Sequence, residues 1–130
     1  MPLSTADQDL LDAARDIIAR RRREGIHEVG AALRTTSGAT FAAVHLEAYV
    51  GRIAVCAEAV ALGMAAATGD TDVEAVVAVN RLGEVVAPCG MCRELILDYA
   101  PEAVVVVPGD PDPEVVRLAE LLPRKYRRSA

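Results

Sequence analysis

The chain has 130 residues, 52% of them hydrophobic, and its formal net charge is −5. This length predicts a single domain over residues 1–130. The acidic balance argues against a nucleic-acid partner, whose phosphates require a basic face, and no apolar run is long enough to predict a membrane span.

A first helix is predicted over Ala6–Arg22, because apolar residues recur there at helical spacing. Thr5–Gln8 has the pattern of a capping box at its start. Arg20–Arg23 fall at its end, where they form either a solvated helix terminus or a phosphate-binding patch.

Two strands joined by a turn follow, over His27–Arg34 and Ala39–Glu47. The segment Ala48–Val55 has no clear periodicity, and we expect a loop there that leads to the next helix. That second helix is predicted over Cys56–Ala67.

The β-branched run Val73–Val79 predicts a buried strand, and a short strand is expected at Glu84–Ala87. A third helix begins near Cys89 and ends at Ala100–Pro101. Val104–Val107 predicts another strand, and a last helix is expected over Glu114–Leu122. The order predicts a three-layer α/β/α fold with a mixed sheet of about five strands.

Two short motifs use every cysteine of the chain: Cys56-Ala57-Glu58 and Pro88-Cys89-Gly90-Met91-Cys92. Zn²⁺ held by three thiolates keeps a fourth position, where a water can bind and become acidic. Glu58 can enter the same pocket without ligating the metal, and can pass a proton from water to a leaving amine. This pattern is typical of zinc nucleobase deaminases. Three cysteines cannot all pair, and with no secretory segment in view they predict the cytoplasm.

Other interpretations of these residues stay open. Cys89 and Cys92 alone would also suit a redox pair or a buried core. Glu58 would also suit a solvated helix start. His27 or His45 could supply a fourth zinc ligand and close a structural Cys₃His site.

With these motifs the chain resembles the small cytidine deaminase superfamily, in the branch of tetrameric cytidine deaminases and blasticidin S deaminases. Further similar stretches are Gly38–Glu47, Cys92-Arg93-Glu94, and Glu120-Leu121-Leu122-Pro123 with Tyr126. The resemblance implies the family fold, zinc on Cys56, Cys89 and Cys92, and Glu58 as proton carrier. It also implies a homotetramer that acts on a small nucleoside or analogue.

The resemblance also implies a substrate site. Glu47 matches the family's sugar-binding carboxylate, but the family's Asn-Val-Glu-Asn is His45-Leu46-Glu47-Ala48 here. We therefore expect His45 in the substrate pocket, unless it is a zinc ligand or a plain strand residue, and a changed or relaxed preference. The Ala57 backbone is expected to bind the ring. Phe41 is expected to pack or to line the pocket floor. Tyr126 is expected either to reach the pyrimidine ring, often in the site of a neighbouring subunit, or to anchor the core.

Three thiolates leave the zinc site anionic. Typical cytidine deaminases have an arginine directly after Cys-Ala-Glu, and Ala59 stands there in this chain. Arg52 and Arg93 are the candidates to offset the charge from beside the metal ligands, and both could instead be surface charges.

The sequence thus predicts a zinc-dependent hydrolytic deaminase of cytidine, deoxycytidine or an analogue, in pyrimidine salvage or in resistance to a toxin. One alternative is a specialised deaminase of an antibiotic nucleoside such as blasticidin S, or of another aminated heterocycle. Outside enzymes, the alternative is a structural zinc protein or a cysteine redox module.

Overall fold

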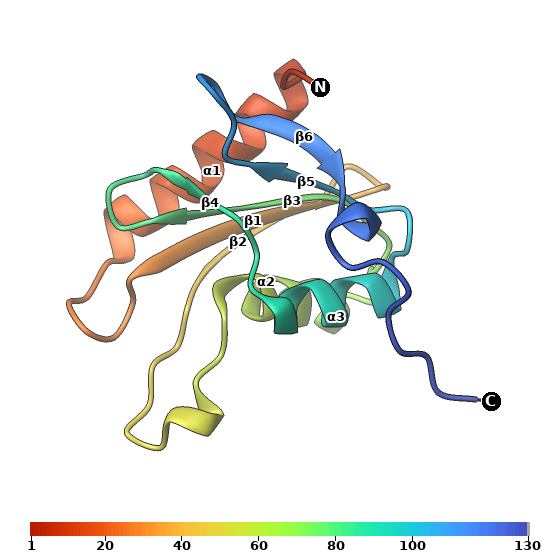
Figure 1. The fold of residues 1–130 in the computed structure, drawn as a ribbon. Coiled ribbons are helices and arrows are strands. Elements are labelled where there is room, and N and C mark those ends of the chain that lie inside the picture. Colours follow the sequence, from red (N-terminus) through yellow and green to blue (C-terminus); the bar gives the residue numbers. More distant parts are fainter. Residues whose placement is uncertain (130) are drawn as a thin grey trace.

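The computed structural model describes residues 1–129, and their helices lie on both faces of one mixed sheet (Figure 1). The helices are α1 (Thr5–Arg21), α2 (Ala57–Ala67), α3 (Gly90–Tyr99) and the short 3₁₀ turns η1 (Gly51–Ile53) and η2 (Leu118–Leu121). The strands are β1 (Val29–Thr35), β2 (Thr40–Val44), β3 (Val73–Asn80), β4 (Val85–Val86), β5 (Val104–Val107) and β6 (Glu114–Arg117). The predicted three-layer α/β/α fold is confirmed.

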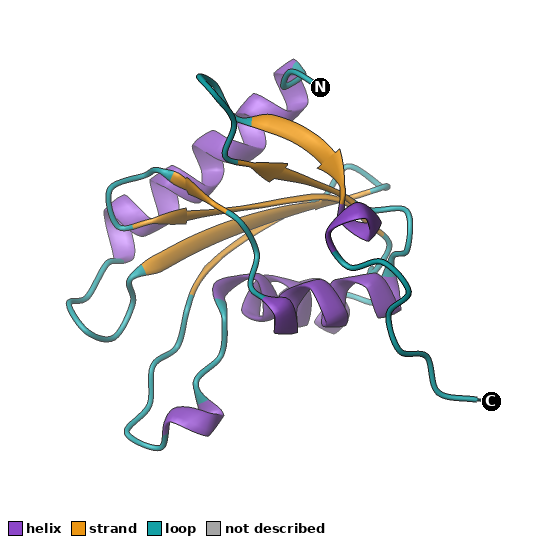
Figure 2. Ribbon diagram, viewed as in Figure 1, coloured by secondary structure: helices purple, strands orange, loops and turns teal. Residues whose placement is uncertain are grey.

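The strands lie in the order β2-β1-β3-β5-β6, with β4 also paired to β3 (Figure 2). Among the strand pairs of residues 1–129, only β3–β5 is parallel, because α3 carries the chain back across the sheet between these strands. The other pairs are antiparallel, as the hairpin of β1 and β2 illustrates with Leu33 opposite Phe41. The sheet is therefore mixed, as expected, with six strands rather than about five.

The capping box of α1 lies one residue earlier than predicted. Ser4 is the N-cap: its hydroxyl accepts from the Asp7 N–H at 3.1 Å, and the Asp7 carboxylate accepts from the Ser4 N–H. The Arg34 guanidinium forms an ion pair with the same carboxylate, with an N–O distance of 3.0 Å. Asp7 therefore ties the helix start to β1.

Helix α1 covers one face of the sheet and packs directly on β1. A Cβ atom at Gly30 would lie 2.8 Å from the Ala14 carbonyl oxygen, so only glycine allows this approach. Leu10, Leu11 and Ile18 are buried on that face against β3 residues such as Val77.

Helices α2 and α3 cover the opposite face. Ala61 and Ala65 of α2 and Ile96 of α3 are buried there with Val76 and Val105 of the sheet. Small alanine side chains let α2 lie close to the strands, so the N-terminal ends of α2 and α3 come together at one end of the sheet.

The prediction of a helix over Glu114–Leu122 is wrong. Glu114–Arg117 is instead strand β6, with Val116 opposite Val105, and only Leu118–Leu121 is helical, as a 3₁₀ turn. The open edge of β5 takes up the β-branched pair Val115 and Val116, because pairing satisfies its backbone groups.

The second predicted strand ends at Val44 rather than at Glu47. Beyond it the chain leaves the sheet, and a bridge between Leu46 and Val55 closes a protruding loop that contains η1. Among residues 1–129, no helix has both the length and the apolar character that crossing a bilayer requires.

Candidate active site

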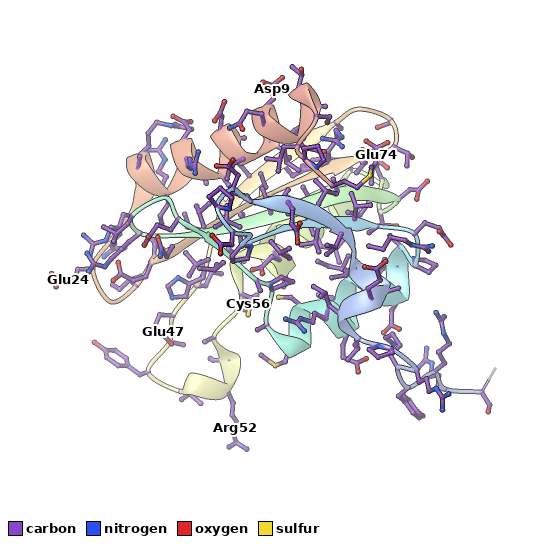
Figure 3. All side chains as sticks on the ribbon, turned by 45° about the horizontal axis from the view of Figure 1, so that its top comes forward. Asp9, Glu24, Glu47, Arg52, Cys56 and Glu74 are labelled. Atoms are coloured by element: carbon purple, nitrogen blue, oxygen red, sulfur yellow. The ribbon has the colours of Figure 1, made fainter. Side chains whose placement is uncertain are left out.

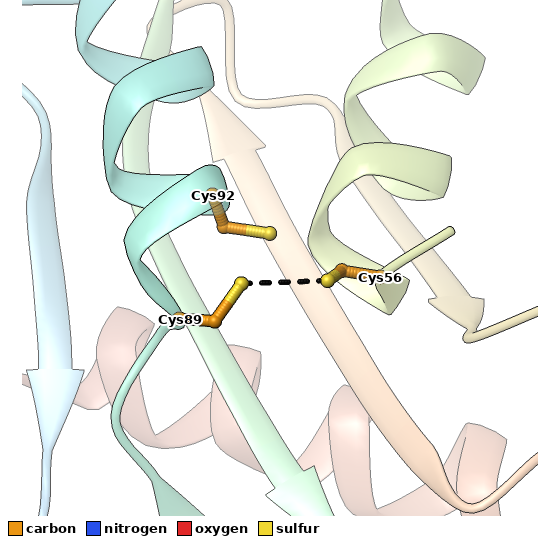
Figure 4. Close-up of side chains that lie close together, drawn as sticks. All are labelled: Cys56, Cys89 and Cys92. Carbon is orange, nitrogen blue, oxygen red and sulfur yellow. Dashed lines mark hydrogen bonds between the residues drawn. The ribbon is translucent and has the colours of Figure 1, made fainter. Parts of the chain in front are cut away.

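The three cysteines meet where α2 and α3 begin (Figure 4). Cys56 is the N-cap of α2, Cys89 is the N-cap of α3, and Cys92 lies in the first turn of α3. Their sulfur atoms all lie within 4.8 Å of one another, and those of Cys56 and Cys89 are 3.4 Å apart. The two motifs, about thirty residues apart in sequence, therefore form one cluster.

This cluster fits a zinc ion. Tetrahedral zinc with Zn–S bonds near 2.3 Å separates its sulfur ligands by about 3.8 Å. The observed cluster needs only small adjustments to match that spacing. Within residues 1–129 neither His27 nor His45 joins the cluster, so the fourth position expected in a catalytic site is not closed by a histidine.

The electrostatics of the cluster favour a cation. Burial raises the pKa of Cys92, and the charges of Glu58 and of the other two sulfurs act in the same direction. Burial opposes ionisation of Cys89 too. Hydrogen bonds from the Cys92 backbone N–H and from the thiols of Cys56 and Cys92 together outweigh burial, so the pKa of Cys89 is lowered. Ionising all three thiols together requires a positive charge between them, which a divalent metal provides.

Glu58 lies in the first turn of α2, directly beside the cluster. It is only 5% exposed, and burial raises the pKa of its carboxyl above the ordinary value. A carboxyl group with a raised pKa is a stronger base than an ordinary one, which suits it to accept a proton and pass it on. The position and burial of Glu58 thus suit general acid/base chemistry.

A cavity of about 440 Å³ opens onto the cluster, a volume within the roughly 300–1,000 Å³ of small-molecule sites. Its walls include Val29, Ala57, Val86 and Met91, which are apolar. The polar and charged lining residues include His45, Arg52, Cys56, Glu58 and Cys89. One cavity thus offers apolar walls for a planar ring beside the cysteines and Glu58.

His45 lines this cavity with its ring held in one tautomer. The backbone N–H groups of Glu28 and Val29 donate to its Nδ1 atom at 2.8 and 3.3 Å. An atom that accepts these bonds carries no proton, so the proton of the neutral ring lies on Nε2. The Nδ1–H of His27 in turn donates to the His45 carbonyl oxygen at 2.8 Å. His45 is therefore a fixed hydrogen-bond donor.

Glu47 follows β2 on the protruding loop and does not line the cavity of its own chain. Its Oε2 lies 3.8 Å from the Nε2 of His45, and its Oε1 accepts from the Ala48 N–H at 3.0 Å. Phe41 packs half-buried against the core beneath α2 and α3, and it is not among the residues that line the cavity. Ala57 lies at the cavity wall, where first-turn N–H groups of α2 have no partner within the helix.

Tyr126 lies far along the C-terminal segment and is 76% exposed. It lines a separate hollow beside α3, with Glu94 and Asp98, and not the cavity beside the cysteines. Within a single chain, the structure does not bring Tyr126 to the other candidate residues.

The two candidate arginines lie in different surroundings. Arg52 is in η1 at the tip of the protruding loop, and its side chain points away from Cys56 (Figure 3). Arg93 follows Cys92, and its guanidinium donates to the carbonyl oxygens of Pro88 and Leu121 at 2.8 and 3.0 Å.

Several cavity residues had no signal in the sequence. Val29 begins β1 and Val86 ends β4, and both form walls of the cavity, but their β-branched side chains are typical of ordinary strand residues. Met91 could have been found from its place between Cys89 and Cys92, since residues inside a ligand motif lie near the metal.

The chain matches the family profile of the cytidine and deoxycytidylate deaminase zinc-binding region over residues 4–108. It is 42% identical to a blasticidin-S deaminase of Bacillus cereus, over 98% of this chain and 96% of the relative. It is 32% identical to a cytidine deaminase of Halalkalibacterium halodurans, over 83% of this chain and 88% of the relative. The structure of cytidine deaminase from Mycobacterium leprae superposes with a TM-score of 0.80 at 29% identity, covering 90% of this chain and 97% of that one.

These similarities extend over almost the whole chain and include both cysteine motifs. They confirm the resemblance drawn from the sequence, together with the zinc-dependent hydrolytic deamination that it implied. The chain belongs to the cytidine deaminase superfamily, as a member of the cytidine and deoxycytidylate deaminase family.

Proposed function

We propose that the cavity beside Cys56, Cys89 and Cys92 is the active site, and that it removes the ring amino group of a cytosine-type nucleoside. One observation carries the proposal: Cys56, Cys89 and the buried Glu58 line one cavity, and the buried Cys92 completes the sulfur cluster at its wall. This arrangement supports a reaction in which water adds to the ring carbon, ammonia leaves and a carbonyl remains.

The cysteines would hold zinc, which when bound supplies a Lewis acid that makes water reactive near neutral pH. Glu58 accepts a proton from the attacking water and returns it to the departing amine. Its raised pKa makes the carboxylate a stronger base toward the attacking water, and the carboxyl group that forms can then give its proton to the leaving amine. Burial of Glu58 also limits the contact of its carboxyl group with bulk water.

The rest of the cavity supports recognition of the substrate. Apolar walls at Val29 and Val86 suit the faces of a pyrimidine ring. The Ala57 backbone N–H would bind the ring edge. The Nε2–H of His45 would meet the sugar or the group in its place, and the carboxylate of Glu47, which lies outside the cavity lining but 3.8 Å from that nitrogen, would meet it from beside the cavity.

A second substrate has specific support: an antibiotic nucleoside of the blasticidin S type. The relative that is 42% identical over nearly the whole chain carries the name blasticidin-S deaminase. At positions 45 and 48, where typical cytidine deaminases have asparagine, this chain has His45 and Ala48. With this substrate the role would be resistance to a toxin, and with cytidine or deoxycytidine it would be pyrimidine salvage.

The proposal includes a homotetramer in the cytoplasm, with residues 1–130 acting as one domain. Tyr126 is exposed and remote from its own cavity, which supports a role in the site of a neighbouring subunit. The apolar side chains of Tyr49, Val50 and Ile53 are exposed on the protruding loop, as an interface between subunits would require. Three unpaired thiols support a reducing compartment.

The test is to measure zinc content and ammonia release together on purified protein. Cytidine, deoxycytidine, cytosine and blasticidin S would each be offered at equal concentration. Zinc near one per chain with release of ammonia from a nucleoside supports the proposal, and the preferred substrate separates salvage from resistance. Protein that holds zinc but releases ammonia from none of the four contradicts it.

A further inference from the structure

The Arg93 guanidinium lies beside the metal-binding turn, half-buried at the N-terminal end of α3. Both hydrogen bonds that the structure gives it within residues 1–129 go to backbone carbonyls. Nε donates to the Pro88 carbonyl at 2.8 Å, and Nη1 donates to the Leu121 carbonyl at 3.0 Å. The guanidinium is thus committed to two carbonyl groups rather than to a cysteine sulfur.

The first of these carbonyls belongs to the peptide that carries the Cys89 nitrogen. Cys89 is the N-cap of α3, and no side-chain hydrogen bond of its own caps the helix. Holding the Pro88 carbonyl fixes the plane of the Pro88–Cys89 peptide. Because the Cys89 sulfur lies only 3.4 Å from that of Cys56, a tilt of this peptide would change the spacing of the cluster.

The second carbonyl belongs to Leu121, the last residue of η2. Carbonyls at the end of a helical turn lack partners within it, and they attract cations. A planar guanidinium can donate in two directions at once, which joins the two segments. Also on α3, the carboxylates of Glu94 and Asp98 lie 3.1 Å and 2.6 Å from the Lys125 ammonium. The C-terminal segment is therefore attached to α3 at two levels.

We propose that Arg93 is a positioning residue that braces the Pro88–Cys89 turn against η2, so that the geometry of the cysteine cluster depends on the C-terminal segment. Arg93 acts through Cys89 and touches neither the metal nor the substrate. The inference rests on the proposed zinc site. It gives Arg93 a mechanical role in place of the charge-offsetting role expected from its sequence position.

The test replaces zinc with cobalt(II), whose thiolate charge-transfer and d–d absorption bands report ligand geometry. Arg93→Ala and Arg93→Gln would be compared with the wild type and with Arg117→Ala. Arg117 on β6 is a matched control, since its exposed guanidinium pairs with Glu102 and its side chain makes no capping hydrogen bond to η2. Metal affinity would be measured by competition with a chromophoric chelator, and metal-free stability by thermal unfolding.

The brace predicts shifted d–d bands and about a tenfold or greater loss of cobalt affinity in Arg93→Ala, because supports of metal ligands contribute on that scale. Arg93→Gln, which can reach only one carbonyl, should lie between Arg93→Ala and the wild type. Arg117→Ala should match the wild type.

A purely structural role would lower the melting temperature of the metal-free variants and leave the bands unchanged, and that result would overturn the brace. If Arg93→Ala does not fold, Arg93→Gln decides: wild-type bands and affinity in that variant would overturn it equally. A wild-type protein that shows no cobalt–thiolate bands would overturn the metal site itself, and the brace with it.

Discussion

The backbone N–H of Glu28 donates to the Nδ1 atom of His45 at 2.8 Å, and this bond leaves the ring proton on Nε2 at the cavity. An asparagine amide at this place would both donate and accept, whereas His45 in this tautomer only donates from its free nitrogen. The substrate group that meets His45 must therefore be a hydrogen-bond acceptor.

His45→Ala should lower kcat/KM for the best substrate by about fivefold or more, because one lost hydrogen bond costs about 1 kcal/mol. The loss should appear mainly in KM, since His45 binds without taking part in proton transfer. His45→Asn should shift the preference toward cytidine, because it restores the amide of typical cytidine deaminases.

His27→Ala is the matched control, because it removes the other histidine and leaves both amide donors to the His45 ring in place. Its effect on KM should be smaller. An unchanged KM in His45→Ala for every substrate would remove His45 from the binding site.

Metal removal should destabilise the protein. A ligand bound at a hundred times its dissociation constant adds about 2.7 kcal/mol to the free energy of unfolding. For a chain of this size that corresponds to a rise in melting temperature of roughly 10 °C. Calorimetry of metal-free and zinc-loaded samples would measure it. The rise should be largely lost in Cys92→Ser, and equal melting temperatures with and without zinc would contradict the three-cysteine site.

The Asp70 carboxylate gives a pH-dependent contribution to stability. The hydroxyls of Thr35 and Ser37 both donate to it at 2.7 Å, and these bonds lower the pKa of Asp70 below its ordinary value. A lowered folded-state pKa means that the contribution is complete above the ordinary pKa and is lost as the pH falls through the folded one.

Thermal unfolding of wild type and Asp70→Ala between pH 7 and pH 2.5 measures this effect. The difference in melting temperature should be full at pH 7 and should shrink below about pH 4, the ordinary range of an aspartate. Asp70→Asn keeps one acceptor without titrating, so it should lie between the two at pH 7. A gap that stays constant down to pH 2.5 would contradict the assignment.

The parts of the fold that local patterns determine were predicted well. Helix α1 follows from apolar periodicity and strand β3 from its β-branched run, and Pro88 indicates the start of α3. Because both cysteine motifs fall at helix starts, their convergence could be expected once the two helices were assigned to the same side of the sheet. The cluster of Cys56, Cys89 and Cys92 required no information beyond this.

Features that depend on distant pairing were not predictable in the same way. Glu114–Leu122 contains good helix formers, and only the open edge of β5 makes its first part a strand. The tautomer of His45 depends on the backbone N–H groups of Glu28 and Val29, at the start of β1, and no local pattern reveals this contact. Tyr126 shows the same limit, because its distance from the cavity follows from the path of the whole C-terminal segment.

The most direct test of the central claim is deamination by Glu58→Gln protein whose zinc content is measured on the same sample. The glutamine preserves the shape of the side chain and cannot carry the proton, so ammonia release should fall by roughly a hundred- to ten-thousandfold. Zinc should remain near one per chain, and the exposed control Glu120→Gln should behave as wild type. Undiminished ammonia release by zinc-loaded Glu58→Gln would contradict the proposed mechanism.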